Sequence, residues 1–146
     1  MMTRYKKILV PYDGSDHARR ALSHAVDLVR SGENASLLLA TVFHAAAVAG
    51  EFDWASMLGK ELLRDAEEKS EAILADGESA IPADVPVKTH FEVGAPGPVL
   101  VKLAADEGCD LIVMGSRGLG PLKGIFMGSV SSWLVSRAAV PVLIIK

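Results

Sequence analysis

The sequence predicts an α/β fold, a single open parallel sheet with helices on both of its faces. Short, mostly apolar runs alternate along the chain with segments whose apolar residues recur at helical spacing. The run at 35–43 is continuously apolar, which is typical of a strand buried on both faces in a parallel sheet. We expect right-handed crossovers between such strands.

Length and composition favour one globular domain over residues 1–146. Half of the residues are apolar and the net charge is −3, so a hydrophobic core can form. No basic stripe predicts a nucleic-acid partner, and no apolar run approaches the roughly 18 residues that would predict a membrane span. The N-terminus leads into a strand-like run without a signal-peptide pattern. The single cysteine, Cys109, cannot form an internal disulfide, which favours a reducing cytoplasm.

The predicted strands are short, mostly apolar and bounded by turn residues. They lie at 7–12, 35–43, 87–93, 111–114 and 140–145. The predicted helices begin after the first four of these strands: after the turn at 13–16, near residue 52, within the proline-rich segment 94–98, and near residue 130. Proline is tolerated in a first helical turn because the N–H that it lacks has no partner there.

The sequence predicts where two of the helices end and which residues form the inner face of the second one. Ser15 or Asp16 can cap the first helix, which ends near 31–32. The second extends over about 52–77 and ends at Gly77. Its predicted inner stripe follows helical spacing: Trp54, Leu58, Leu62, Ala66, Lys69 and Ile73.

The connection from Gly115 to Ser129 is rich in glycine and joins a predicted strand to a predicted helix. It is longer than the about two to six residues that usually make such a connection. Glycine lets a backbone approach a ligand closely, and a helix N-terminus favours phosphate. This segment therefore predicts the phosphate site of a nucleotide.

Asp13 follows the first predicted strand and Gly115 follows the fourth. In open parallel sheets, ligands bind at the carboxyl ends of the strands, where the strand order reverses. If the two strands are neighbours there, Asp13 and the glycine-rich segment face one cleft, and Asp13 can accept hydrogen bonds from ribose hydroxyls. The alternative role of Asp13 is to cap the first helix.

Three common motifs do not fit. The P-loop requires Gly-Lys-Ser/Thr, but Lys123 is followed by glycine and no lysine precedes Ser129. The dinucleotide fingerprint belongs on the first strand-to-helix turn, which holds only one glycine. The nucleophile elbow lacks its second glycine after Ser129.

The pattern that remains is Gly115-x-x-Gly118, nine residues, then Gly128-Ser129. It resembles the signature of the universal stress protein family, in its ATP-binding branch. Further segments are similar in the same order along the chain: 6–15, 35–43, 110–118 and 140–145. Only the middle of the chain, roughly 45–80, lacks a clear resemblance.

The resemblance implies an adenine-nucleotide α-hydrolase-like sheet of order 3-2-1-4-5, with ATP between the first and fourth strands. Asp13 would bind the ribose, and the Val42 backbone would bind adenine. The other implied ligand-binding residues line the pocket or wrap the ribose and phosphates: Pro11, Met114, Gly115, Arg117, Gly118, Gly128, Ser129, Val130 and Ser131. It also implies a homodimer through the strand at 140–145, which would be an apolar sheet edge in need of cover.

Three functions remain open. The leading hypothesis is a nucleotide-dependent regulatory protein, because a phosphate site is predicted without an evident general base. A slow ATP hydrolase or nucleotidyl-transfer enzyme is the second, in which Asp13 or Asp16 could hold Mg²⁺. An interaction module without a ligand is the third. We place His17, His24, His44 and His90 at surface or edge positions, since none has triad or metal-site spacing.

Overall fold

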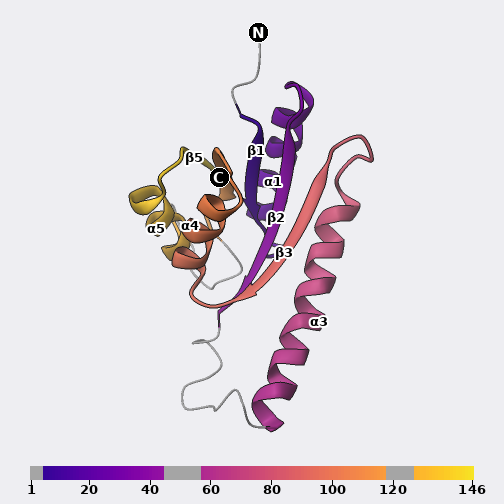
Figure 1. Cartoon of the computed structure of the whole chain (residues 1–146), viewed down its shortest axis with the longest axis vertical. Helices are drawn as coiled ribbons and strands as arrows, with labels where there is room; N and C mark the ends of the chain where they lie inside the picture. The colour runs from indigo at the N-terminus through magenta and orange to yellow at the C-terminus, as the bar shows by residue number, and fades with distance from the viewer. Residues whose placement is uncertain (1–4, 45–56, 118–126) are drawn as a thin grey trace.

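The structure, a computed structural model, describes residues 5–44, 57–117 and 127–146. Its centre is a sheet of five parallel strands in the order β3-β2-β1-β4-β5, which confirms the predicted fold class and strand order (Figure 1). In chain order the strands are β1 (Lys7–Pro11), β2 (Ser36–Phe43), β3 (Val87–Val93), β4 (Leu111–Gly115) and β5 (Val142–Ile145).

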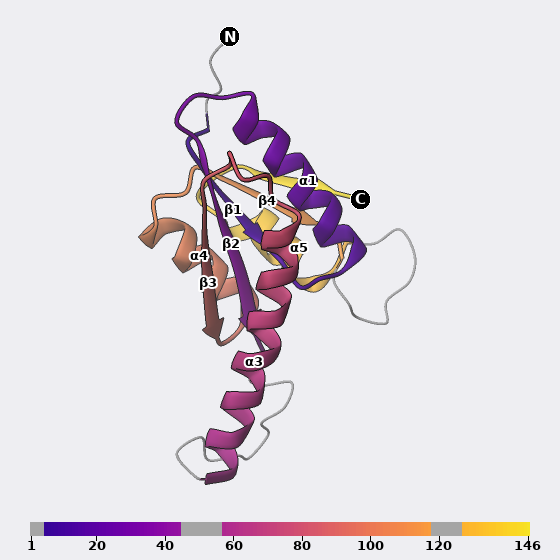
Figure 2. The ribbon, with the colours of Figure 1, turned by 90° about the vertical axis from the view of Figure 1, so that its right-hand side faces the viewer.

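Helices cover both faces of the sheet. In chain order they are α1 (Asp16–Arg30), α3 (Met57–Ser79), α4 (Pro96–Asp106) and α5 (Ser129–Arg137). Figure 2 shows α1 and α3 on one face, with α4 and α5 behind the strands on the other. This separation produces two hydrophobic clusters, one on each face of the sheet.

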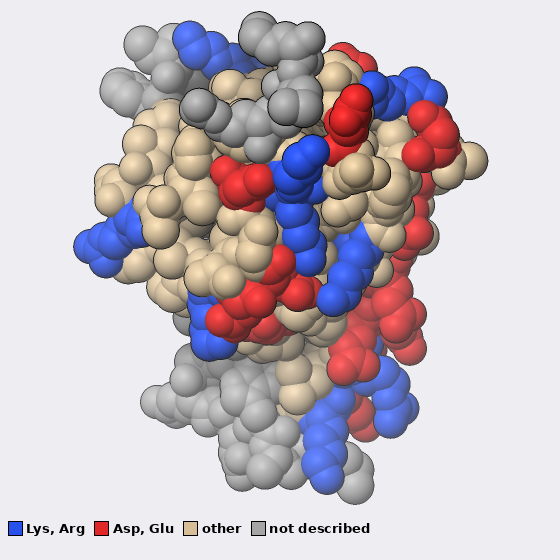
Figure 3. All heavy atoms as spheres, turned by 45° about the horizontal axis from the view of Figure 1, so that its top comes forward, with Lys and Arg blue, Asp and Glu red and all other residues tan. Residues whose placement is uncertain are grey.

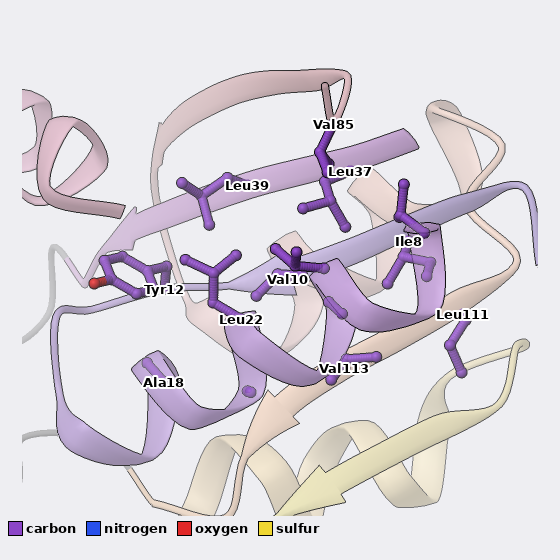
Figure 4. Close-up of a cluster of buried hydrophobic side chains, with 14 of the residues drawn as sticks. Ile8, Val10, Tyr12, Ala18, Leu22, Leu37, Leu39, Val85, Leu111 and Val113 are labelled. Atoms are coloured by element: carbon purple, nitrogen blue, oxygen red, sulfur yellow. The ribbon is translucent and has the colours of Figure 1, made fainter. Parts of the chain in front are cut away.

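The central strand β1 contributes to both clusters because its side chains alternate between the faces. Ile8 and Val10 pack toward α1, whereas Leu9 packs toward α4, and all three are fully buried. Leu9 pairs with Leu38 of β2 and with Ile112 of β4. Figure 4 shows the α1 side of this core, where residues from α1 and three neighbouring strands meet. A continuous apolar run is thus required in β1, β2 and β4.

The first helix begins as predicted, and Ser15 is its cap. The Ser15 hydroxyl accepts a hydrogen bond from the Ala18 amide at 3.2 Å, while Asp16 is the first helical residue. The helix ends at Arg30. Its inner face is made of small and aliphatic residues: Ala18, Ala21, Leu22, Ala25, Val26 and Val29.

The prediction for α3 was wrong in two respects. Lys69 is exposed, and the buried position on that turn is Ser70, 3% exposed, because the helix turns a slightly different face to the sheet. Gly77 does not end the helix, which continues to Ser79. Instead, Gly77 packs so closely against β2 that an added Cβ would lie 2.8 Å from the Leu39 side chain. The predicted Trp54 contact lies outside the described residues.

Charged side chains of both signs lie next to one another on the surface (Figure 3). Lys88 pairs with Glu107 at 2.7 Å, and Arg30 pairs with Asp84 at 2.8 Å. Within the described ranges, no helix combines the length and apolar character needed to cross a bilayer.

Candidate functional site

A cavity of about 290 Å³ opens at the carboxyl ends of β1 and β4. These two strands are hydrogen-bonded neighbours, and β2, which follows β1 in the chain, lies on the opposite side of β1 from β4. The cavity therefore lies at the point where strand order reverses, which is where ligands bind in open parallel sheets.

All the predicted site residues within the described ranges line this one cavity: Pro11, Asp13, Val42, Met114, Gly115, Arg117, Gly128, Ser129, Val130 and Ser131. Gly118, the remaining predicted site residue, lies outside the described residues. The fold thus brings together segments from β1, β2, β4 and the start of α5 that are far apart in the sequence.

Sequence reasoning missed several lining residues that lie in helices, inside a strand or directly after β1: Tyr12, Ala18, Ala40, Pro96 and Leu100. A signal existed for two of them. Pro96 is the first residue of α4, and Leu100 lies one turn further along the same helix, on its apolar face. Both residues therefore belong to the N-terminal part of α4, which lies near the carboxyl ends of the strands. Their aliphatic surface adds to that of Val42 and Met114.

Asp13 lies in a tight turn between β1 and α1. Its Oδ1 accepts a hydrogen bond from the Ser15 amide at 2.9 Å. The turn also needs glycine, because Gly14 has a φ of +80°. Ser15 caps the helix, so Asp13 shapes the turn while its carboxylate lines the cavity.

The start of α5 is fastened to the end of β4 through one carbonyl. The Ser116 carbonyl oxygen accepts hydrogen bonds from the Gly128 amide at 2.6 Å and from the Ser131 hydroxyl at 2.8 Å. Gly128 is the N-cap and has no side chain to bond the first-turn amides. Such amides have no partner within a helix, so the α5 N-terminus offers donors and a partial positive charge to an anion in the cavity.

Gly115 lines the cavity, and the packing of α1 against the end of β4 also requires a glycine at this position. A Cβ at this position would lie 2.6 Å from the His17 Cβ and 2.8 Å from the His17 carbonyl carbon. Because one of these atoms belongs to the α1 backbone, the neighbour cannot simply rotate away. Helix α1 can approach the end of β4 only if residue 115 has no side chain.

The expectation for His17 was wrong. His17 is half-buried, and its Nδ1 lies 2.9 Å from the Ser116 hydroxyl, while its Nε2 lies 3.4 Å from the Arg117 guanidinium. The partners lie about a hundred residues away in the sequence, so helical spacing alone could not reveal them. His24 and His44 are exposed as expected, and His90 lies on the edge strand β3 beside Glu92.

Cys109 lies outside the cavity, in the buried core cluster on the α4 face of the sheet. It is 5% exposed, and burial raises the pKa of its thiol to about 11. Across the described parts of the chain, no three histidine, cysteine or acidic residues are grouped as a metal site would require.

The fold and the cavity together define a class of protein: an open parallel α/β domain with a cavity at its topological switch point. The family model for the universal stress protein family matches residues 4–146. The chain therefore belongs to the universal stress protein family.

Relatives of known sequence and structure agree with this assignment. A universal stress protein from Thermus aquaticus is 34% identical, and the alignment covers 97% of this chain and 99% of the relative. The solved structure of the protein MJ0577 of Methanocaldococcus jannaschii is similar, with a TM-score of 0.78 at 34% identity, covering 97% of this chain and 96% of that one. A universal stress protein solved in complex with cAMP has a TM-score of 0.59 at 29% identity, with 97% of each chain covered.

Proposed function

We propose that this chain binds an adenine nucleotide, foremost ATP, and acts as a nucleotide-dependent regulatory protein in a stress response. One observation carries the proposal: Asp13, the end of β4 and the N-terminus of α5 line a single cavity at the switch point of the sheet. Its volume of about 290 Å³ is near the lower end of small-ligand sites, which are roughly 300–1,000 Å³. The relative in complex with cAMP supports an adenine ligand.

In this proposal each part of the cavity binds a different part of the nucleotide. Asp13 accepts hydrogen bonds from the ribose hydroxyls, and the Val42 backbone bonds adenine, with Pro11 and Met114 packing beside it. The ribose and phosphates contact the remaining predicted residues: Gly115, Arg117, Gly118, Gly128, Ser129, Val130 and Ser131. The Ser131 hydroxyl already bonds Ser116, so Ser131 contributes its amide rather than its hydroxyl.

A regulatory role fits the described lining better than efficient catalysis does. Among the described residues that line the cavity, Asp13 carries the one carboxylate, and it already bonds the Ser15 amide. Mg²⁺ could accompany ATP through Asp13 or Asp16, although Asp16 is exposed and lies 3.6 Å from Arg19. We expect at most slow ATP turnover.

The same proposal includes a cytoplasmic homodimer that forms through residues 140–145. Strand β5 is an edge of the sheet, and Leu143 on it is 40% exposed. An apolar edge strand offers unpaired backbone groups and is normally covered. The cytoplasmic location rests on the single cysteine, which is buried as a thiol.

The test is isothermal titration calorimetry with ATP on the wild type and on Gly128→Val. Gly128 has extended backbone angles, φ −69° and ψ 167°, and an added Cβ would have its nearest contact at 3.4 Å. Valine should therefore be tolerated by the fold while its methyl groups occupy the space next to the α5 amides. We expect ATP affinity to fall at least about tenfold, the loss of roughly 1.4 kcal/mol.

Ser132→Val is the matched control, because Ser132 is exposed on the same helix and does not line the cavity. It should bind ATP like the wild type. A wild-type chain that binds no adenine nucleotide would refute the proposed function. A folded Gly128→Val variant with unchanged ATP affinity would refute the assignment of the phosphates to the α5 N-terminus.

A further inference from the structure

His17 does not line the cavity. It lies behind Arg117, at the end of the cavity to which we assign the phosphates. Its two ring nitrogens contact two consecutive residues that follow β4. Nδ1 is 2.9 Å from the Ser116 hydroxyl, and Nε2 is 3.4 Å from the Arg117 guanidinium. Of these three residues, only Arg117 also lines the cavity.

The chemistry of the partners determines which nitrogen of His17 carries the proton. A guanidinium group only donates hydrogen bonds, so Nε2 must accept from Arg117 through its lone pair. In a neutral ring, Nδ1 then carries the hydrogen and donates it to the Ser116 hydroxyl. One neutral tautomer therefore satisfies both contacts.

The imidazole is held by a rigid frame. The backbone of His17 packs against Gly115, where no space for a side chain remains. Ser116 is held on both sides, since its amide donates to the Ile145 carbonyl at 2.8 Å and its own carbonyl accepts from the Gly128 amide at 2.6 Å. An arginine side chain has many rotamers, and fixing it in one of them when an anion binds costs conformational entropy. A fixed acceptor such as His17 Nε2 restricts Arg117 beforehand and so lowers this cost.

We propose that His17 is a positioning residue for phosphate recognition, which holds the Arg117 guanidinium at the cavity so that phosphorylated nucleotides are bound in preference to the nucleoside. This inference rests on the proposed function and goes beyond it by assigning a role to a residue outside the cavity. It predicts that loss of the Nε2 acceptor weakens the binding of ATP and leaves the binding of adenosine unchanged.

The experiment compares ATP and adenosine by calorimetry on the full chain with three substitutions. His17→Phe keeps an aromatic ring at this position and removes the hydrogen bonds to Ser116 and Arg117. His17→Gln places an amide oxygen near the Nε2 position and can accept from Arg117. His17→Asn places its amide near Nδ1 and can bond Ser116 only.

We expect His17→Phe and His17→Asn to lower ATP affinity about fivefold to tenfold with adenosine affinity unchanged, and His17→Gln to restore most of the ATP affinity. In the background of Arg117→Met, His17→Phe should have no further effect on ATP affinity, because the residue through which it acts is absent. If His17→Phe does not fold, the difference between the Gln and Asn variants decides.

Equal ATP affinities for the Gln and Asn variants would overturn the inference, since the ring would then only fill space. Equal losses for ATP and adenosine would overturn it as well. A wild type that binds neither ligand overturns the proposed function, and this inference with it. A wild type that binds ATP while all three variants match it overturns the inference alone.

Discussion

Gly115 shows how one residue can serve both the packing of the fold and the proposed ligand site. It lines the cavity, and the space where its side chain would be is occupied by His17 of α1. A substitution at this position therefore changes the packing of α1 before it changes any contact with a ligand. For this reason Gly128, and not Gly115, is the position at which nucleotide binding can be tested in a folded protein.

We expect Gly115→Ala to lower the free energy of unfolding by about 1–3 kcal/mol, the usual cost of overpacking. The added Cβ would be 2.6 Å from the His17 Cβ, and 2.8 Å from a backbone carbon that cannot move independently. Urea unfolding followed by circular dichroism measures the change. Gly128→Ala is the control, since a Cβ added there meets no atom closer than 3.4 Å. It should cost only about 0.5 kcal/mol, because alanine is a poorer N-cap than glycine; equal stabilities for the two variants would contradict the packing role.

At the scale of elements, the C-terminal turns of α3 are held against the end of β1 by polar contacts. The Tyr12 hydroxyl donates a hydrogen bond to Asp76 at 2.6 Å, and Arg19 of α1 lies 3.4 Å from the same carboxylate. Burial raises the pKa of Tyr12, and the Tyr12 hydrogen bond lowers the pKa of Asp76. These three residues connect β1, α1 and α3 at the edge of the core.

The depressed pKa of Asp76 predicts a specific loss of stability in acid. The ionised carboxylate stabilises the folded state above its ordinary pKa of 3.8, and this stabilisation is lost as the pH falls through the lower value of the folded state. Tyr12→Phe removes the largest cause of the shift, so the variant should lose less stability than the wild type as the pH falls below the ordinary pKa of 3.8. It should also be slightly less stable at pH 7, because the hydrogen bond is gone.

Urea unfolding at pH 7, 4 and 3 measures this difference. Tyr5→Phe is the matched control, since Tyr5 is half-buried beside the same core, and its acid dependence should equal that of the wild type. The assignment fails if Tyr12→Phe and the wild type lose the same stability on acidification.

At the scale of the whole molecule, the two edges of the sheet differ. Strand β3 presents Lys88, His90 and Glu92, and Lys88 and His90 pair with acidic groups. Strand β5 is aliphatic, and both Leu143 on it and Val135 on the neighbouring helix α5 are large exposed apolar residues. Charged edge strands resist pairing with other chains, whereas apolar ones favour it. The proposed dimer therefore belongs at β5.

We expect Leu143→Lys to convert the proposed dimer into a monomer, because an edge lysine places a charge on the apolar surface that would be covered. Leu143 is 40% exposed, so the fold itself should be little affected. Size-exclusion chromatography with light scattering measures the mass. Ala75→Lys, at an exposed position on α3, is the control and should keep the wild-type mass. A Leu143→Lys variant that remains dimeric would refute the assignment of the interface to β5.

Much of the fold could be predicted because its signals are local. The apolar runs that became β1 and β2 are continuous since both of their faces are covered, and Ser15 is recognisable as a cap next to the helix that it starts. The strand order came from the resemblance to a family, which also indicated where the cavity would be. Asp13 and Gly115 could be paired because the carboxyl ends of neighbouring parallel strands meet at one edge.

The sequence by itself therefore determined the class of fold, its elements to within a few residues, and most of the segments that line the cavity, but not the parts of α1 and α4 that also line it. Only the tertiary structure decided which side chains meet across those elements. It showed Ser70 rather than Lys69 at the inner face of α3, and it placed His17 against Ser116 and Arg117. The physical reason is that periodicity reports which face of an element is buried, whereas a contact between distant residues depends on the rotation and close approach of whole elements, which Gly115 permits here by having no side chain.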